Sequence, residues 1–247
     1  MLHMKILGMD TTTATASVAL VEDGRLVFEE VLAGCTELAD LSAPTKRTNH
    51  AETLLPLIER VVKRAQITFS EISALAVSIG PGSFTGLRIG LSTVKGLSYG
   101  WEIRVIGVPT LPAIAARVTD WHGLICPLLD ARRKEVYAAL FYKKEDEGLK
   151  RLTEDLVCPP EQIMREIQTY HRETCLIIGD GTRVYKDLIN ACLADRAQVT
   201  LGESYPSTAF SVARIAGERL EKGKIDSPGL LVPLYLRPFE AGLKKKP

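Results

Sequence analysis

Two stretches of the chain follow one pattern, and this repeat restricts the possible folds more than any other feature of the sequence. Residues 5–10 and 125–130 are apolar runs that each end in an aspartate, and further strand-like segments follow both. Later, an apolar run closes on Gly-x-Gly at 80–82 in the first half and at 179–181 in the second. A single doubly wound sheet would not produce this correspondence. The pattern therefore predicts a duplicated α/β fold.

Each half is expected to contain three strands followed by alternating helices and strands. Apolar runs and alternating residues predict strands, and aliphatic residues at helical spacing predict helices. The first half is predicted to have strands at 5–10, 16–21, 26–32, 74–79 and 104–108, with helices near 54–65, 87–97 and 110–118. The second is predicted to have strands at 125–130, 135–142, 149–157, 175–178 and 199–202, with helices at 161–170 and 207–221. The predicted domains are 1–120 and 121–247, the second including an extended tail.

Composition limits the classes of partner and compartment. The chain has 31 Lys and Arg against 30 Asp and Glu, so it has no strong overall field to hold nucleic acid or an anionic membrane. Its five cysteines form no Cys-x-x-Cys pair, and no apolar run approaches the ~20 residues that span a bilayer. A cytoplasmic protein without membrane contact is expected. The basic run at 132–134 is interpreted either as a solvated loop or as a contact for tRNA or an acidic partner.

The segment 78–90, Ser-Ile-Gly-Pro-Gly-Ser-Phe-Thr-Gly-Leu-Arg-Ile-Gly, joins a predicted strand to a predicted helix. Gly80, Pro81 and Gly82 end the strand, because proline fixes φ and glycine allows a positive φ, and with Gly86 they are assigned as a structural turn. Two interpretations stay open. The turn could hold a phosphate at the helix N-terminus, or it could only let the strand and helix pack closely. The Walker A pattern is absent, since no lysine follows the last glycine.

Four motifs together resemble one family. They are Met-Asp-Thr-Thr-Thr at 9–13, the glycine segment 78–90, Leu-Asp-Ala-Arg-x-x-Glu-Val-Tyr at 129–137, and Pro-x-Tyr-Leu-Arg at 233–237. They resemble the bacterial TsaB (YeaZ) family over essentially the whole chain. The resemblance implies the ASKHA (actin-like) fold, in which two ribonuclease-H-like halves each have a mixed sheet of βββαβα type. It also implies a non-catalytic partner subunit of the complex that makes threonylcarbamoyladenosine beside the anticodon of tRNA.

The same resemblance implies a set of partners. A subunit of this family docks a TsaD-type catalytic subunit, helps to recruit a TsaE-type ATPase, and meets tRNA only through the complex. A homodimer is expected when the chain is alone. Two alternatives stay open: an ASKHA small-molecule phosphotransferase and a degenerate metallopeptidase-like protein.

The loops that bind nucleotide in ASKHA proteins are altered here. Those loops read Asp-x-Gly after the first strand of each half, because only glycine lets the backbone come close to the phosphates. In this chain they read Asp-Thr-Thr at 10–12 and Asp-Ala-Arg at 130–132. No tightly bound cofactor is expected. A weak adenine-nucleotide site remains possible, and its candidate residues are Asp10, Thr11, Thr12, Thr13 and Asp130.

Metal ligands are also missing from the place where the resemblance would put them. Catalytic relatives have an Asn-His-x-x-x-His metal motif, and the corresponding segment here, 107–114, contains no histidine. The four histidines of the chain lie far apart in sequence. The sequence therefore predicts no metal site and no catalytic residue.

The two long helices of the first half have more apolar surface than one core contact needs. On the helix that follows the glycine segment, small and apolar residues form a second face beside the one that must cover the sheet. The preceding helix has an apolar arc wider than ~100°. The faces could pack only on each other, but the resemblance favours partner docking. The predicted partner-binding residues are Leu55, Ile58, Val62, Ile89, Ser92, Thr93 and Gly96.

Overall fold

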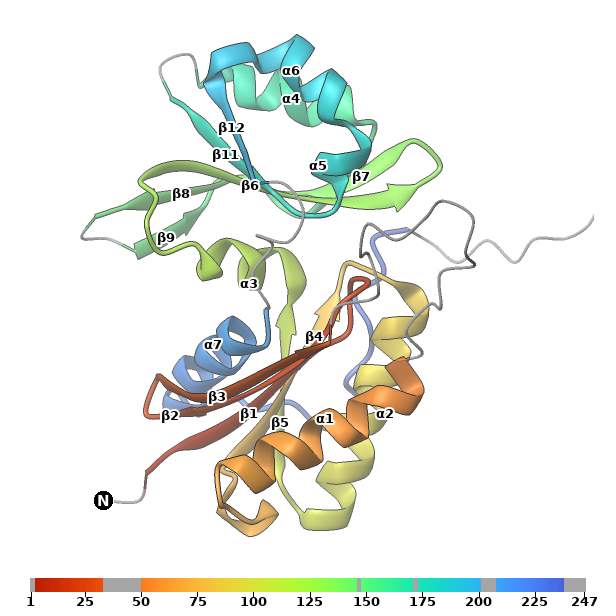
Figure 1. Ribbon diagram of the computed structural model, residues 1–247, viewed down its shortest axis with the longest axis vertical. Helices are drawn as coiled ribbons and strands as arrows, with labels where there is room; N and C mark the ends of the chain where they lie inside the picture. The colour runs from red at the N-terminus through yellow and green to blue at the C-terminus, as the bar shows by residue number, and fades with distance from the viewer. Residues whose placement is uncertain (1–2, 33–49, 146–147, 171–172, 201–207, 238–247) are drawn as a thin grey trace, which may run out of the picture.

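Each half of the chain forms its own mixed β-sheet, and Figure 1 shows the two α/β units one above the other. The structure is a computed structural model that describes residues 3–32, 50–145, 148–170, 173–200 and 208–237. In the first sheet the strand order is β3-β2-β1-β4-β5. Its strands are β1 (Lys5–Asp10), β2 (Ala16–Glu22), β3 (Arg25–Leu32), β4 (Ala74–Gly80) and β5 (Arg104–Pro109).

The first sheet combines an antiparallel meander with parallel crossovers. β1, β2 and β3 pair antiparallel, whereas β4 pairs parallel to both β1 and β5. At the β2–β3 turn, Asp23 and Gly24 both have positive φ, at 48° and 79°, as the two-residue hairpin requires. Helices cover both faces: α1 (His50–Arg64) and α2 (Phe84–Trp101) lie on one, α3 (Thr110–Arg117) and α7 (Ala209–Glu221) on the other (Figure 1).

The second sheet repeats this plan. Its order is β10-β7-β6-β11-β12, with β6 in the position that β1 has in the first sheet and β11 parallel to it. The duplicated fold predicted from the sequence repeat is therefore confirmed. The strands are β6 (Gly123–Arg132), β7 (Glu135–Ala138), β8 (Phe141–Lys144), β9 (Gly148–Arg151), β10 (Leu156–Cys158), β11 (Cys175–Ile178) and β12 (Ala197–Thr200). The helices are α4 (Pro160–Thr169), α5 (Gly181–Val184) and α6 (Lys186–Leu193).

Two predicted strands of this half are each divided. The segment predicted at 135–142 forms β7 and β8, and the one at 149–157 forms β9 and β10. The break lies at Leu140, whose N–H donates to Thr153 Oγ1 at 2.9 Å and whose carbonyl accepts the Leu152 N–H at 2.8 Å. Because these groups leave the ladder, β7 pairs with the end of β6 and β8 pairs with its beginning.

The last helix and the tail return to the first half. α7 packs on β1, β2 and β4, and a Cβ on Gly8 would overlap the Ala209 carbonyl, so the helix approaches the sheet closely there. Beyond α7, the Asp226 N–H donates to the Val105 carbonyl at 2.9 Å, and the Leu234 N–H donates to the Ile79 carbonyl at 2.7 Å. The predicted division near residue 120 stays a prediction, but these elements lie on the first sheet.

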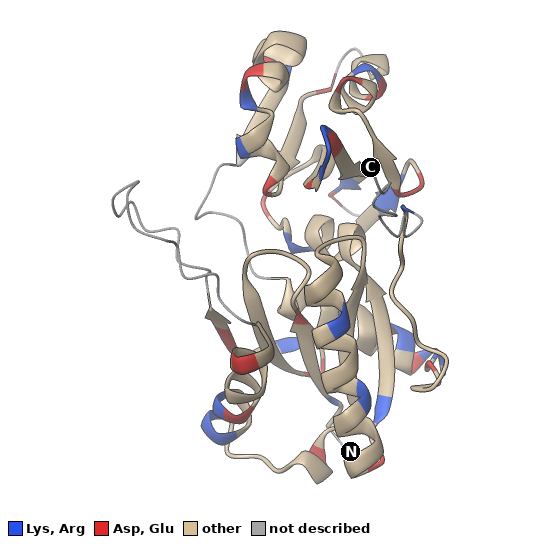
Figure 2. Cartoon of the chain, turned by 90° about the vertical axis from the view of Figure 1, so that its right-hand side faces the viewer, with Lys and Arg blue, Asp and Glu red and all other residues tan. Residues whose placement is uncertain are grey.

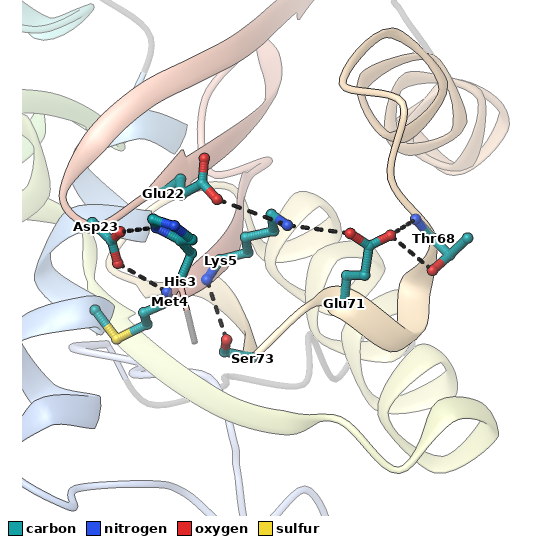
Figure 3. Close-up of polar contacts among 8 residues, drawn as sticks. All are labelled: His3, Met4, Lys5, Glu22, Asp23, Thr68, Glu71 and Ser73. Atoms are coloured by element: carbon teal, nitrogen blue, oxygen red, sulfur yellow. Dashed lines mark hydrogen bonds and ion pairs between the residues drawn. The ribbon is translucent and has the colours of Figure 1, made fainter. Parts of the chain in front are cut away.

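Polar contacts connect neighbouring segments where β1 begins (Figure 3). Lys5 Nζ lies 3.2 Å from Glu71 Oε1 and 3.7 Å from Glu22 Oε1. His3 Nδ1 lies 2.6 Å from Asp23 Oδ2, and this hydrogen bond raises the pKa of the exposed His3. These pairs join the start of β1 to the β2–β3 turn and to the short 3-10 helix Phe69–Glu71.

Candidate functional site

The loop after β1 surrounds a buried carboxylate. Asp10 is 2% exposed, and its Oδ1 accepts hydrogen bonds from the Thr12 N–H at 3.0 Å and the Thr12 hydroxyl at 2.7 Å. Its Oδ2 accepts the Thr208 hydroxyl, which comes from the residue before α7. Burial raises the pKa of Asp10, and the Thr12 hydrogen bonds oppose that shift. The carboxylate therefore ties the end of β1 to the start of α7.

The glycine segment lies directly on this loop. The Ser83 N–H donates to the Thr12 carbonyl at 2.7 Å, and the Thr11 hydroxyl donates to the Gly86 carbonyl at 2.7 Å. A Cβ on Gly82 would lie 2.6 Å from the Thr12 carbonyl oxygen, and one on Gly86 would overlap the Thr11 carbonyl. Of the two interpretations of this turn, these contacts support close packing, because the glycines make room for the Thr11–Thr12 backbone.

Gly80 and Pro81 belong to the same turn, and Gly80 packs on the tail. Gly80 has a φ of 119°, and a Cβ there would lie 2.6 Å from the Leu234 carbonyl oxygen. α2 then begins with Ser83 as its N-cap, whose hydroxyl accepts the Gly86 N–H at 3.2 Å. Two of the N–H groups that a phosphate could use at this helix end, those of Ser83 and Gly86, are thus engaged within the chain.

The corresponding loop after β6 is built in a related way. The Asp130 N–H donates to Asp180 Oδ1 at 2.9 Å, while Asp130 Oδ1 accepts the Arg132 N–H at 2.8 Å. The Arg132 guanidinium lies 3.0 Å from Asp130 Oδ2. Gly181, in the second Gly-x-Gly, packs on the Leu128 carbonyl, which a Cβ would approach to 2.8 Å. The second Gly-x-Gly therefore packs on β6, whereas the first packs on the loop after β1 and on the tail.

Asp180 is a site residue that the sequence prediction missed. It lies between the two glycines of the second Gly-x-Gly, so the repeat with Gly80-Pro81-Gly82 contained a signal for it. Burial raises the pKa of its carboxyl, the hydrogen bond from the Asp130 N–H lowers it, and the nearby negative charge of Asp130 raises it. Within the described residues, no hydrogen bond or ion pair joins Asp130 to Asp10 or to the threonines that follow it. The predicted nucleotide residues thus form two separate loops.

The tail connects the two halves at a cleft. The Arg88 side chain donates to the Tyr235 hydroxyl at 3.2 Å, and the Tyr235 ring stacks on Phe84 with centroids 5.1 Å apart. Arg237 donates to the Ala131 carbonyl at 3.2 Å and forms an ion pair with Glu135. The cleft is lined by Pro81, Gly82, Phe84, Leu87, Arg133, Tyr137, Leu234, Tyr235, Leu236 and Arg237.

The outer surface of α1 and α2 contains only part of the predicted docking set. Ile58 and Val62 are 1% and 7% exposed and belong to the hydrophobic core between the first sheet and the helices that cover it. Their assignment as partner contacts is therefore wrong. The cause is that α1 packs over β2 and β3 as well as beside α2, which buries a wider arc of the helix. By contrast, Leu55 is 53% exposed.

The α2 part of the predicted set lies at or near the surface. Ser92 and Gly96 are exposed, and Ile89 and Thr93 are half-buried. Around a Cβ placed on Gly96, no heavy atom of the described residues lies within 4 Å. Beside it, a shallow groove is lined by Ala51, Phe84, Thr85, Arg88, Ile89, Ser92 and Thr93. Figure 2, in which α2 faces the viewer, shows that charged residues are sparse on this helix.

The described ranges contain neither a metal-binding cluster nor a membrane-spanning helix. No group of three or more His, Cys, Asp or Glu residues there is arranged to hold a metal ion. Among the helices that the structure describes, none has the length and apolarity needed to cross a bilayer.

Alanine substitutions at Gly86 and Gly96 of α2 should change the free energy of unfolding in opposite directions. We expect Gly86→Ala to lower the free energy of unfolding by about 3 kcal/mol or more, or to prevent soluble expression, because the Cβ overlaps backbone. Gly96→Ala should raise it by about 1 kcal/mol, because alanine favours a helix and the site is open. Urea unfolding of both variants measures this. Equal effects of the two substitutions would contradict the close-packing role of Gly86.

The raised pKa of Asp10 makes a prediction about pH. In the folded chain the carboxyl keeps its proton to higher pH than in the unfolded chain, so its contribution to stability is lost as pH rises through the raised pKa. Asp10→Asn keeps an acceptor for Thr12 and an amide that can donate to Thr208. We expect the difference in melting temperature, Asp10→Asn minus wild type, to become more positive from pH 4 to pH 7. Asp10→Ala is the control and should be less stable throughout. A difference in melting temperature between Asp10→Asn and wild type that does not change with pH would contradict a raised pKa of Asp10.

Comparisons with known proteins agree with this fold. A family model described as TsaD, tRNA N6-adenosine threonylcarbamoyltransferase, matches residues 44–242. The chain is 31% identical to the tRNA threonylcarbamoyladenosine biosynthesis protein TsaB of Escherichia coli (strain K12) over 240 residues, 95% of each chain. It is 29% identical to the protein of the same description from Bacillus subtilis (strain 168) over 245 residues, 98% of this chain and 97% of the other.

A solved structure shows the shared fold independently. The crystal structure of a Pseudomonas aeruginosa protein, described as similar to peptidase YeaZ, matches with a TM-score of 0.75 at 24% identity, covering 95% of this chain and 100% of the other. The family model covers most of the chain, and the E. coli relative is matched over nearly its whole length. The chain therefore belongs to the family that the TsaD model describes, and within it to the TsaB (YeaZ) family.

Proposed function

We propose that this chain is a non-catalytic subunit in the synthesis of threonylcarbamoyladenosine in tRNA, and that it docks a TsaD-type catalytic subunit through the outer surface of α1 and α2. The named function of its relatives supports the process. The observation that carries the docking role is the contrast between the two sides of α2. Gly86 and Gly90 on the inner side touch Thr11, whereas Gly96 on the outer side is open.

The composition of that outer surface suits a helix partner. Ser92, Thr93 and Gly96 leave room for the ridge of another helix, as ridge-into-groove packing requires. Leu55 and Ile89 add apolar contact area beside them. A buried interface core is depleted of charge, and Arg88 and Lys95 are the charged residues within α2. A second copy of this chain could occupy the same surface when the catalytic subunit is absent.

The hydrogen bonds that both aspartate loops make within the chain support a non-catalytic role. A nucleotide at the first loop would have to displace the Ser83 and Thr12 N–H groups from partners within the chain. Any adenine nucleotide held there should bind weakly, which leaves turnover to the partner. A TsaE-type ATPase then joins the assembled pair, and tRNA binds through the complex.

A charge at the centre of the docking surface should abolish assembly. We expect Gly96→Arg to eliminate co-elution with a TsaD-type subunit in size-exclusion chromatography, because an unpaired charge buried in an interface costs about 3–5 kcal/mol. Its circular dichroism and melting temperature should stay close to wild type, since a Cβ at Gly96 meets no heavy atom of the described residues within 4 Å beyond its own helix backbone. Gln162→Arg, at an exposed position of α4, is the charge-matched control. Full co-elution of Gly96→Arg would place the docking surface elsewhere.

Reconstitution separates this function from the phosphotransferase alternative. Supplied with ATP and an activated threonylcarbamoyl donor, the TsaD-type subunit, TsaE-type ATPase and tRNA should form threonylcarbamoyladenosine with this chain present and not without it. The chain alone should show no ATP turnover above a blank. Robust turnover by the chain alone, abolished by Asp10→Ala at a temperature where that variant is folded, would instead favour a phosphotransferase.

A further inference from the structure

The turn between β6 and β7 has an unusual residue choice. Arg132 pairs with Glu135 in the ladder, so Arg133 and Lys134 form a two-residue loop. Arg132, Arg133 and Lys134 have φ of 61°, 54° and 63°, all in the left-handed region. Two-residue loops of this kind favour Asn-Gly or Asp-Gly, because a Cβ is strained at positive φ. Three consecutive cations occupy these positions instead, and such strain concentrates at functional sites.

The surrounding residues hold this turn in place. Asp130 accepts the Arg132 N–H and pairs with its guanidinium, while Arg237 of the tail pairs with Glu135 on the opposite strand. The turn is therefore fixed on both sides by charged partners. Arg133 and Lys134 are exposed at its tip, and the hairpin projects from the second unit (Figure 1).

Aromatic residues lie next to these cations. Arg133 and Tyr137 line the cleft from the hairpin, and Phe84 and Tyr235 line it from the first half and the tail. Phe84 is 36% exposed and Tyr235 is 40% exposed. Arginine binds phosphate through parallel hydrogen bonds, and unpaired bases stack on aromatic rings. An acidic protein segment would use the charges but not the rings, so the combination favours single-stranded RNA.

We propose that the β6–β7 turn is an RNA contact, in which Arg133 and Lys134 bind phosphates of an unpaired segment and the aromatic cleft beside them receives a base. The proposal rests on the proposed function, because the RNA is the tRNA substrate of the complex. It also agrees with the net charge of +1, since a contact of two cations is weak alone and acts only as part of an assembly.

The test replaces the two cations by the residues that the turn geometry prefers. Arg133→Asn with Lys134→Gly removes both charges and relieves the positive-φ strain, so the hairpin should be as stable as wild type or more stable. Lys222→Gln with Lys224→Gln removes two exposed charges after α7 and is the matched control. Each protein is assembled with the TsaD-type subunit. Binding of fluorescent tRNA is then measured by anisotropy from 50 to 200 mM salt.

The expected result is weaker tRNA binding by the Asn-Gly variant. The slope of log K against log salt should become shallower by about 1.4, because each lost single-strand phosphate contact removes about 0.7. Co-elution with the TsaD-type subunit and melting temperature should match wild type, and the lysine control should bind tRNA normally. Arg133→Gln alone, which retains Lys134, should show about half of the slope change.

Two outcomes would overturn the proposal. Unchanged tRNA affinity and slope would show that the turn does not touch RNA. Loss of co-elution with the TsaD-type subunit would show that the turn contacts a protein. Failure of the proposed function is recognised separately, because the wild-type chain itself would then not assemble or not support tRNA modification.

Discussion

The carboxylate of Asp10 is the interaction on which much of this structure depends. It lies where β1 ends, accepts two hydrogen bonds from Thr12, and accepts a third from Thr208, almost two hundred residues later. An unpaired carboxylate in this buried position would be costly, so each of these donors is needed. The same contacts fix the loop on which α2 begins and the point at which α7 meets the first sheet. One buried group thereby sets the position of two helices on opposite faces of the sheet.

Close packing of backbone on backbone follows from that arrangement. Where the loop held by Asp10 touches the glycine segment, it leaves no space for a side chain, and glycine is the residue that fits at Gly82 and Gly86. In nucleotide-binding relatives of this fold class, a glycine in the loop would leave space for phosphate. Here the glycines are in the helix segment and threonines are in the loop. In this chain the glycines serve a close contact between the glycine segment and the loop after β1.

The sequence alone predicted the features that local patterns encode. The duplicated strand order followed from repeated aspartate-ended strands, and the β2–β3 hairpin followed from Asp23-Gly24. Burial of Ile58 and Val62 was not predicted, because helical periodicity gives the direction of a side chain but not how far a sheet and a neighbouring helix enclose it. The contacts of the tail could not be predicted from the sequence either. Tyr235 meets Arg88, 147 residues away, and no local pattern reports a contact between positions so far apart.

The return of α7 to the first sheet has a consequence for synthesis on the ribosome. The second sheet is inserted, in chain order, between α3 and the last helix of the first unit. The face of β1, β2 and β4 that α7 covers is apolar and stays open until the last part of the chain has been made. At roughly 5–20 residues per second, the stretch from the end of β5 to the end of α7 takes roughly 6–22 seconds. The amino-terminal half is thus the first to be translated but cannot be the first to finish folding, and its uncovered sheet is the surface most in need of protection in the nascent chain.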